Sequence, residues 1–252
     1  MKFEGDDRPP PGWRRLAELI WLAPRVLRGF GSVGPHGPED GPPALVLPGF
    51  MAGDRTCMQL RRSLAQAGWR VHPWRLGLNK GVQPDMLRRL EACLDRMSAK
   101  EPVLLVGWSL GGIYARELAR HAPDRVRAVV TLGAPFSGDP RQNNVWRLYE
   151  KVAGHKVDNP PIPRFADKPP VPSLAIWSRR DGIIAPRAAR GLDSERDKAV
   201  DIGCSHMAFG VSAKAGRDVV REIKIFLSEI DRQVPEHETT DRSGRGNGAF
   251  PN

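Results

Sequence analysis

Cysteine is scarce in this chain, and the few cysteines present are badly placed for cross-linking. Cys57, Cys93 and Cys204 are the three cysteines among 252 residues, and no two of them form a Cys-x-x-Cys pair. An odd number of widely separated thiols suggests neither a disulfide framework nor a structural zinc site. We therefore expect three reduced thiols, partly buried in the domain.

Long apolar runs are missing as well. No stretch reaches the roughly 18 uninterrupted apolar residues that a transmembrane helix needs. The N-terminus, MKFEGDDRPPP, carries acidic residues and a proline run where a secretory signal would have basic and apolar regions. From these two absences we expect a cytoplasmic protein without a membrane span.

Acidic residues are outnumbered, since 29 Asp and Glu stand against 39 Lys and Arg and leave a net charge of +10. Such an excess can attract nucleic acid or an anionic membrane. The basic residues are spread along the chain, however, many of them close to Asp or Glu, and no nucleic-acid-binding motif accompanies them. We expect no nucleic-acid partner.

The N-terminal tail, residues 1–43, holds an amphipathic segment over residues 12–30 and a Gly/Pro-rich linker. The segment has apolar residues at helical spacing, a basic side, and Pro24, which must kink or end the helix. Two interpretations remain open. The helix docks its apolar face on the domain, or its tryptophans and basic face make a peripheral membrane contact. We expect that this tail and the disordered tail 233–252 can both be removed without loss of the fold.

Residues 44–232 alternate between short apolar runs and amphipathic stretches, which indicates one α/β domain. Continuous apolar strands between helices predict a mostly parallel sheet, here of about six strands, with helices on both faces. Asp54 stands where the N-cap of the first of these helices belongs. The expected strands are 44–47, 69–74, 103–106, 126–132, 173–177 and 199–202, and the expected helices are 55–67, 84–98, 110–121 and 213–231.

The segment 136–171 breaks this alternation. It contains one helix expected at about 142–153 and a proline-rich run from Pro160 to Pro172. A long irregular insertion in a compact domain is often functional. We therefore predict a short lid.

Residues 107–111, Gly-Trp-Ser-Leu-Gly, match G-x-S-x-G between an expected strand and an expected helix. A serine on such a sharp turn is held in a strained backbone with its hydroxyl exposed. The turn crowds its neighbours, so small residues are needed at Gly107 and Gly111, and Gly112 lets the helix approach the sheet. This elbow, which also includes Trp108, makes Ser109 the expected nucleophile.

A serine nucleophile needs a base, and the base needs an acid that orients it. Of six histidines, His206 lies after the last expected strand, at the sheet edge where Ser109 also lies. Asp181 follows the preceding strand at the same edge, and the chain order Ser, Asp, His is that of nucleophile-elbow hydrolases. Asp193 and Asp201 are weaker candidates for the acid, because one follows a short helix and the other lies inside a strand.

An oxyanion hole requires two backbone N–H donors aimed at the reacting oxygen. We expect one donor at Leu110, directly after the nucleophile. The second should come from the loop after the first strand, residues 48–53, where Gly49 permits the bend. Phe50 is the preferred residue there and Met51 the next.

With these motifs in place, the chain resembles the α/β-hydrolase superfamily, and within it the lipase/esterase-like bacterial members. The resemblance spans residues 44 to about 230 and implies the α/β-hydrolase fold and a Ser-His-Asp triad that works through an acyl-enzyme without a metal or an organic cofactor. The oxyanion loop departs from the family because no His-Gly or Gly-Gly-Gly precedes Phe50. The stretches that carry the resemblance are LVLPGF (45–50), LLVGWSLGG (104–112), VVTLGAPF (129–136), SRRDGII (178–184) and GCSHMAFG (203–210).

We expect a serine hydrolase that cleaves carboxylic esters of lipophilic acyl groups, with a small-molecule ester or lipid as its substrate. An acyl-thioesterase or acyltransferase would use the same triad, and a catalytically silent scaffold is a third alternative. Apolar residues near the triad could form the acyl site or simply pack the core. They are Phe50, Met51, Trp108, Phe136, Met207 and Phe209.

Overall fold

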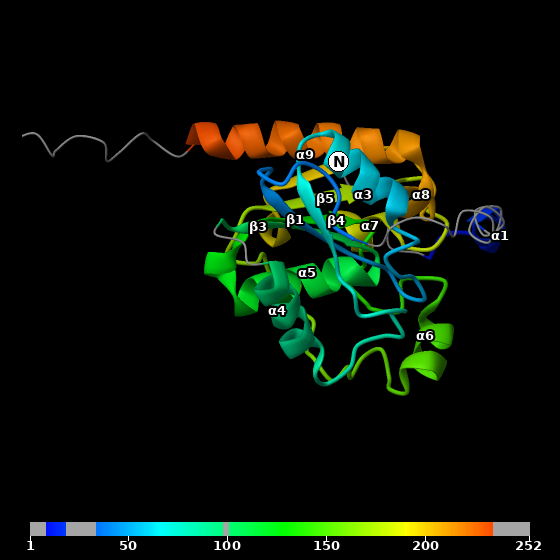
Figure 1. Cartoon of the computed structure of the whole chain (residues 1–252). Coiled ribbons are helices and arrows are strands. Elements are labelled where there is room, and N and C mark those ends of the chain that lie inside the picture. Colours follow the sequence, from blue (N-terminus) through cyan, green and yellow to red (C-terminus); the bar gives the residue numbers. More distant parts are fainter. Residues whose placement is uncertain (1–8, 19–33, 98–100, 234–252) are drawn as a thin grey trace, which may run out of the picture.

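A six-stranded sheet organises the part of the chain that the computed structural model describes, residues 9–18, 34–97 and 101–233 (Figure 1). All neighbouring strands pair in parallel, in the order β2-β1-β3-β4-β5-β6. The predicted number of strands and their direction are thus confirmed. The strands are β1 (Pro43–Leu47), β2 (Arg70–Pro73), β3 (Val103–Trp108), β4 (Val126–Leu132), β5 (Ser173–Trp177) and β6 (Lys198–Asp201).

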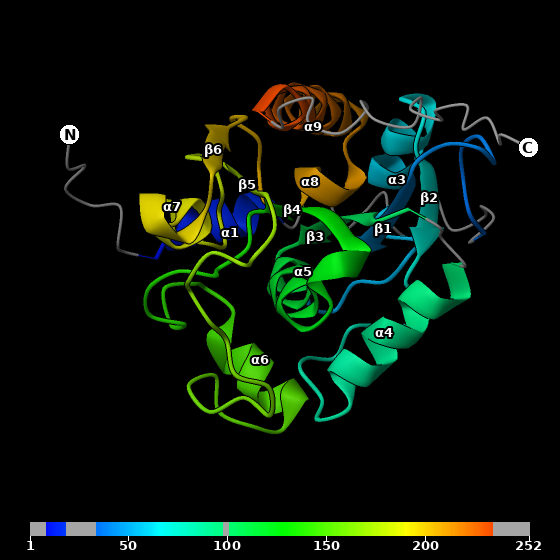
Figure 2. The ribbon, with the colours of Figure 1, turned by 90° about the vertical axis from the view of Figure 1, so that its left-hand side faces the viewer.

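Helices cover both faces of this sheet (Figure 2). One face carries α3 (Met58–Gln66), α8 (Ala208–Val211) and α9 (Ala213–Gln233), and the other carries α4 (Met86–Met97) and α5 (Leu110–His121). Helix α7 (Pro186–Arg190) packs beside β5, and α6 (Trp146–Ala153) lies beyond α5, away from the sheet. Two short 3-10 helices, η2 (Pro123–Arg125) and η3 (Asp193–Glu195), precede β4 and β6.

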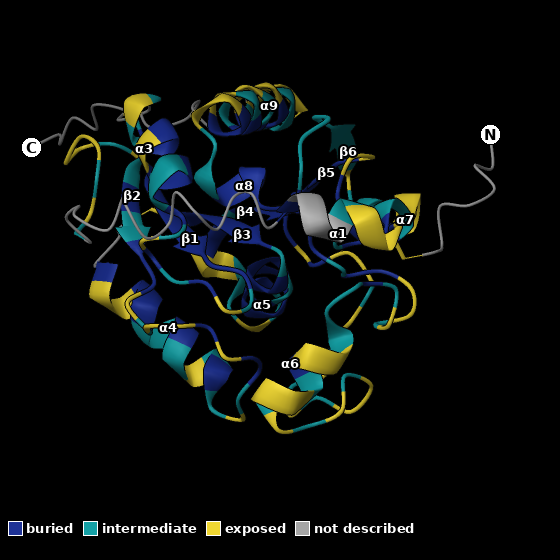
Figure 3. Ribbon diagram, turned by 90° about the vertical axis from the view of Figure 1, so that its right-hand side faces the viewer, coloured by how far each residue is buried: buried dark blue, intermediate teal, exposed yellow. Residues whose placement is uncertain are grey.

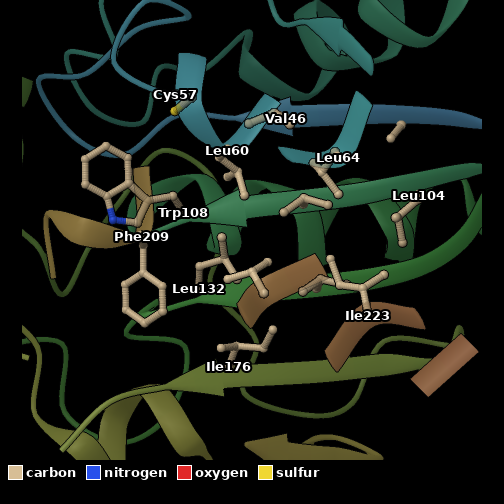
Figure 4. Packing of buried hydrophobic residues seen from close by; sticks show 14 of the residues in the cluster. Val46, Cys57, Leu60, Leu64, Leu104, Trp108, Leu132, Ile176, Phe209 and Ile223 are labelled. Atoms are coloured by element: carbon tan, nitrogen blue, oxygen red, sulfur yellow. The ribbon is translucent and has the colours of Figure 1, made fainter. Parts of the chain in front are cut away.

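Alternate strand residues face opposite apolar layers, because successive side chains of a strand point to opposite faces. Val46 and Val106 pack under α3 and α9, whereas Leu45 and Leu105 pack against α4 and α5. Figure 4 shows part of the first layer, where Ile223 of α9 reaches the sheet. The central strands β1, β3, β4 and β5 are buried on both faces (Figure 3), which explains their continuous apolar sequences. The edge strands differ, because β6 is half-buried and β2 alternates between buried and half-buried residues.

The start of α3 corrects a prediction. The helix begins at Met58 rather than at 55, and Asp54 does not cap it. The Asp54 carboxylate instead accepts hydrogen bonds from the backbone N–H groups of Trp74 (3.0 Å) and Arg75 (3.1 Å), just beyond β2. Burial raises the pKa of Asp54 above its ordinary value, although both bonds favour the charged form.

Helix α1 (Gly12–Glu18) is the described part of the helix predicted over 12–30, and the remainder, with Pro24, lies outside the described residues. It docks on the domain through polar groups. Arg14 Nη1 donates to Arg179 O at 2.8 Å, and Glu18 is buried, while Trp13 is 66% exposed. None of the described helices has the length and apolar character to cross a membrane. Peripheral membrane contact through this segment stays a prediction.

The segment between β4 and β5 contains a single α-helix among its residues 133–172, and that helix starts later than predicted. Helix α6 begins at Trp146 rather than at 142, because Asn143 organises a turn before it. The Asn143 side chain donates to Pro140 O at 2.7 Å and accepts from the N–H of Val145 at 2.9 Å. An asparagine that bonds the nearby backbone in this way favours a turn over a helix.

Candidate active site

Ser109 lies in a sharp turn between β3 and α5. Its backbone has φ 54° and ψ −122°, a positive φ that few non-glycine residues adopt. The N–H of Ser109 donates to Leu132 O at 2.8 Å on the neighbouring strand β4, and the N–H of Gly112 donates to Ser109 O at 2.9 Å. These two bonds stabilise the strained turn, and strain of this kind concentrates at functional sites.

The glycines around Ser109 are required by close backbone contacts. A Cβ at Gly107 would lie 2.3 Å from Gly111 O, and one at Gly111 would lie 2.1 Å from Leu47 O. A Cβ at Gly112 would lie 2.5 Å from the Cβ of Ala134, on the segment after β4. Any larger residue at these positions would push the turn away from the sheet.

Asp181 follows β5 and is almost fully buried, with 1% of its surface exposed. Its Oδ1 accepts backbone N–H bonds from Ile183 and Ile184, both at 2.8 Å, and its Oδ2 lies 2.7 Å from His206 Nδ1. The two other candidates for the acid lie elsewhere. Asp193 pairs with Arg196 at the surface, and Asp201 pairs with Arg179.

His206, in the loop after β6, is 3% exposed and lies between aromatic rings. The ring centroid of Trp108 lies 5.8 Å away and that of Phe209 6.5 Å away, and Trp108 Nε1 donates to His206 O at 3.1 Å. A carboxylate can only accept a hydrogen bond, so Nδ1 carries the proton that bonds Asp181. In the neutral ring, Nε2 is then free to accept a proton.

Two opposing influences act on the pKa of His206. Burial lowers this pKa, whereas the charge of Asp181, its hydrogen bond and the more distant charge of Glu18 raise it. The carboxylates prevail, and the pKa of His206 lies above its ordinary value. The site therefore favours the imidazolium form that a general base passes through after it accepts a proton.

The loop after β1 passes directly beside the serine. A Cβ at Gly49 would lie only 3.0 Å from Ser109 Cβ, and the next residue, Phe50, lines the same pocket as Ser109 and Leu110. Met51 does not fit the role of an alternative donor to an oxyanion. It has a φ of 54°, and its N–H already donates to Asn79 O at 2.7 Å. Phe50 and Leu110 therefore stay as the expected pair.

A mostly apolar pocket with a cavity volume of about 80 Å³ opens at Ser109. Much of its wall comes from the segment between β4 and β5, the predicted lid, whose apolar residues are half-buried around α6. The lining residues are Phe50, Val82, Ser109, Leu110, Ile113, Pro135, Pro140, Asn143, Val145, Trp146, Tyr149, Val157, Pro160, Ile162, Arg164 and Ile184.

Most of the apolar residues expected near the acyl site pack the core instead. Of that set only Phe50 lines the pocket. Trp108, Met207 and Phe209 belong to the layer under α3 and α9, and Phe136 packs with Ala134 and Ala175. The lid residues that do form the wall are signalled in the sequence only by their position in the insertion.

Sequence reasoning also missed Glu18. Its carboxylate accepts backbone N–H bonds from Gly182, His206 and Met207, across more than 160 residues of chain. No local pattern marks it. Within the described residues, His, Cys, Asp and Glu side chains form no group of three or more that could hold a metal ion.

The architecture and the sequence agree with a known family. The family whose description is "alpha/beta hydrolase fold" matches residues 64–159. The chain has the alpha/beta hydrolase fold. Over 125 residues it is 30% identical to a pimeloyl-[acyl-carrier protein] methyl ester esterase of Nitrosospira multiformis. That match covers 44% of this chain and 45% of the relative, less than half of either protein.

Solved alpha/beta hydrolase structures resemble this chain in fold at low identity. The naproxen esterase (carboxylesterase NP) of Bacillus subtilis superposes with a TM-score of 0.52 at 14% identity, over 86% of this chain and 100% of that one. The thioesterase domain from the curacin biosynthetic pathway has a TM-score of 0.52 at 15% identity, over 74% of this chain and 93% of that one. These similarities concern the fold alone, which the chain shares with both structures.

Proposed function

We propose that this protein is a serine hydrolase that cleaves carboxylic esters of lipophilic acyl groups. The observation that carries the proposal is the 2.7 Å hydrogen bond between buried Asp181 and His206, at the sheet edge that also presents Ser109 in its strained turn. An oriented imidazole and a half-buried serine that lines the pocket at the same edge are the parts that acyl transfer through a serine requires.

In the proposed reaction, His206 Nε2 takes the proton of Ser109 Oγ as that oxygen attacks the acyl carbonyl. Asp181 holds the imidazole in the correct tautomer and stabilises the imidazolium that forms. The N–H groups of Leu110 and Phe50 donate to the oxyanion of the tetrahedral intermediate. His206 then gives its proton to the leaving alcohol, and water releases the acyl group from Ser109 by the reverse sequence of proton transfers.

The pocket supports an apolar acyl group. A largely apolar wall, which includes Ile113 of α5 and the residues Val157 and Ile162 of the predicted lid, would bury a hydrocarbon chain next to Ser109. Each buried methylene contributes about 0.8 kcal/mol, so a few extra carbons change the specificity constant severalfold or more. We therefore expect kcat/KM to rise with acyl length until the pocket is full.

The test is the initial rate of hydrolysis of p-nitrophenyl esters from acetate to palmitate, with wild type and Ser109→Ala side by side. We expect the variant to lose at least about 10³-fold in kcat. Ser228→Ala is the matched control, because Ser228 lies exposed on α9, where its Oγ only donates to Ile225 O. It should keep the wild-type rate.

The outcomes separate the alternatives. If Ser109→Ala retained the wild-type rate, the nucleophile would be wrong. If folded wild type hydrolysed no ester but cleaved acyl-CoA thioesters, with loss of that activity in Ser109→Ala, the same site would be an acyl-thioesterase. Transfer of the acyl group to an added alcohol in preference to water would identify an acyltransferase.

A further inference from the structure

The carboxylate of Glu18 on α1 is a buried charge that the mechanism does not use. Glu18 is 4% exposed although glutamate is rarely buried without partners. Its Oε1 accepts the N–H of Gly182 at 3.1 Å and that of His206 at 2.8 Å, and its Oε2 accepts the N–H of Met207 at 2.9 Å. Three hydrogen bonds to a charged acceptor offset much of the cost of burying it.

The three donors belong to the two loops that carry the acid and the base. Gly182 directly follows Asp181, and His206 is itself a donor together with Met207. One carboxylate therefore joins the loop after β5 to the loop after β6, while the side chains of Asp181 and His206 bond each other at 2.7 Å. A shift of Glu18 would move both loops, and with them the geometry of the pair.

The surroundings of Gly182 show how closely α1 fits against this place. A Cβ at Gly182 would lie 2.6 Å from Arg14 O and 3.1 Å from Glu18 Cγ. Asn144, from the lid segment, donates to Gly182 O at 3.0 Å and to Pro10 O at 2.8 Å, so it bonds both the acid loop and the residues before α1. The N-terminal segment, residues 10–18, thus packs against the loop that carries Asp181.

We propose that Glu18 is a positioning residue of the active site, which holds the Asp181 and His206 loops in the register that their hydrogen bond requires. The inference rests on the proposed function, because it assigns to Glu18 the alignment of that hydrolytic pair. Glu18 contacts neither the pocket nor Ser109 and acts through the backbone of the two loops.

The charge of Glu18 gives this role a measurable signature. The titratable groups that influence His206 are Asp181 and Glu18, and both raise its pKa against the effect of burial. Cys204, on the same loop, is neutral because burial and the two carboxylates raise the pKa of its thiol far above the ordinary value. Removal of the Glu18 charge should therefore lower the pKa of His206, which a purely structural role of Glu18 would not predict.

The test compares Glu18→Gln and Glu18→Asp in the full chain. Glutamine can still accept from Gly182 and His206, but its amide NH₂ would face the N–H of Met207, and the charge is gone. Aspartate keeps the charge on a shorter side chain. The matched control is Glu195→Gln, because Glu195 is also buried and its carboxylate also accepts a backbone N–H, that of Leu192, away from the site.

Two readouts are needed, kcat with KM on the preferred p-nitrophenyl ester, and the pKa of His206 from NMR titration of the histidine ring signals. We expect Glu18→Gln to lower kcat by roughly 10- to 100-fold with little change in KM, since small misplacements of reacting groups cost rates of this order. The pKa of His206 should fall in Glu18→Gln, while Glu18→Asp should recover part of both effects.

The NMR titration reports on Glu18 whether or not the protein hydrolyses esters, so the two proposals fail separately. A wild type without turnover overturns the hydrolase, and an unchanged pKa of His206 in Glu18→Gln overturns the role of Glu18. A loss of activity in Glu195→Gln as large as in Glu18→Gln would also overturn it, because the effect would then come from stability alone.

Discussion

At Gly133 the backbone passes so close to the Asp181–His206 pair that a side chain would press on both partners. Gly133 has a φ of +53°, and a Cβ there would lie 3.0 Å from Asp181 Oδ2 and 3.1 Å from His206 Nδ1. We expect Gly133→Ala to displace the pair and lower kcat by about 10-fold or more, since alignment within a fraction of an ångström matters. Steady-state kinetics on an ester substrate measures the effect.

A matched glycine separates backbone strain from this contact. Gly68, at the end of α3, also has a positive φ (+107°), but a Cβ there would meet no atom within 4 Å. Gly68→Ala should cost about 1 kcal/mol of stability and leave kcat unchanged. Equal losses of kcat in the two variants would show that strain, and not contact with the pair, explains the result.

The raised pKa of His206 predicts a pH dependence. His206 must be neutral to accept a proton, so kcat/KM should fall as the pH drops through its folded-state pKa, which lies above the ordinary value. In Asp181→Asn the charge and hydrogen bond that raise this pKa are lost, so the effect of burial prevails. We expect the acidic limb of a pH–rate profile to move to lower pH, and kcat to fall by about 10³-fold or more.

The same raised pKa has a consequence for stability. A group that binds its proton more tightly in the folded state stabilises that state fully below its unfolded pKa of about 6.5, and this contribution is lost as the pH rises through the folded pKa. Asp181→Asn should weaken this trend in denaturant titrations across the same pH range. If the acidic limb of the pH–rate profile stayed at the wild-type pH in Asp181→Asn, Asp181 would not be the group that raises the pKa of His206.

Residues that a local motif or a place directly after a strand marks could be predicted, whereas contacts between distant segments could not. Ser109 is marked by its glycines, and His206 and Asp181 by their place after strands at one sheet edge. The hydrogen bond of the Met51 N–H to Asn79 O, and those of Glu18 to the loops of Asp181 and His206, depend on how distant segments meet. No periodicity or spacing in the sequence encodes such meetings.

At the scale of elements, Arg116 of α5 bonds the part of the predicted lid that precedes β5 to the domain. Its guanidinium is 1% exposed and donates to Ala166 O and Asp167 O, both at 2.7 Å, and to Glu195 O at 3.1 Å. It also lies 4.2 Å from the ring centroid of Phe136. Burial, together with the charge of Arg120, lowers the pKa of Arg116 to about 10.

We expect Arg116→Met to lower the free energy of unfolding by about 3 kcal/mol, because three carbonyls lose a charged donor in a buried place. Urea denaturation measures this, and limited proteolysis should show faster cleavage of residues 154–172. Arg125→Met is the control, since Arg125 forms an exposed pair with Asp95 at 2.9 Å. That variant should lose less than about 1 kcal/mol. Similar losses of unfolding free energy in both variants would contradict the stabilising role of Arg116.

The strands and the longer helices followed from the sequence in number and order, but the starts of α3, α4 and α6 did not. Continuous apolar runs predicted the central strands β1, β3, β4 and β5, because both faces of a parallel sheet are buried there. The starts of α3 and α6 were placed too early since Asp54 and Asn143 bond backbone groups outside the expected helix. Side chains of this kind compete with the helical backbone, and the sequence does not say which partner wins.

At the scale of the whole molecule, the strand order brings the site together. β1, β3, β5 and β6 end at the same edge of the sheet, so the loop of Phe50, the turn of Ser109 and the loops of Asp181 and His206 converge there. Helix α1 then reaches this edge from the far end of the sequence and bonds two of the loops. The sheet and its apolar layers are therefore built from residues after 43, whereas the proposed site also requires residues 10–18.

Because α1 contributes to the proposed site but not to the apolar layers, removal of the N-terminal tail should affect activity more than the fold. The sequence also predicts that the fold tolerates this removal. A chain without residues 1–18 keeps the sheet and its two apolar layers, whose described members all lie after residue 43. It loses the contacts of Arg14 and Glu18 with the loops that carry Asp181 and His206. We expect a folded protein whose melting temperature falls by only a few degrees, as a loss of about 1–2 kcal/mol gives at this size.

Activity should fall much further than stability, by roughly 10- to 100-fold in kcat, because the acid and base loops lose the carboxylate that joins them. Circular dichroism melts and ester kinetics on the same preparation measure both quantities. A chain that starts at residue 9 is the control, since it retains Pro10, Arg14 and Glu18, and it should keep the wild-type rate. If removal of residues 1–18 left kcat unchanged, α1 would be an appendage of the fold. If removal unfolded the protein, α1 would be part of the core that the fold requires, and not only part of the site.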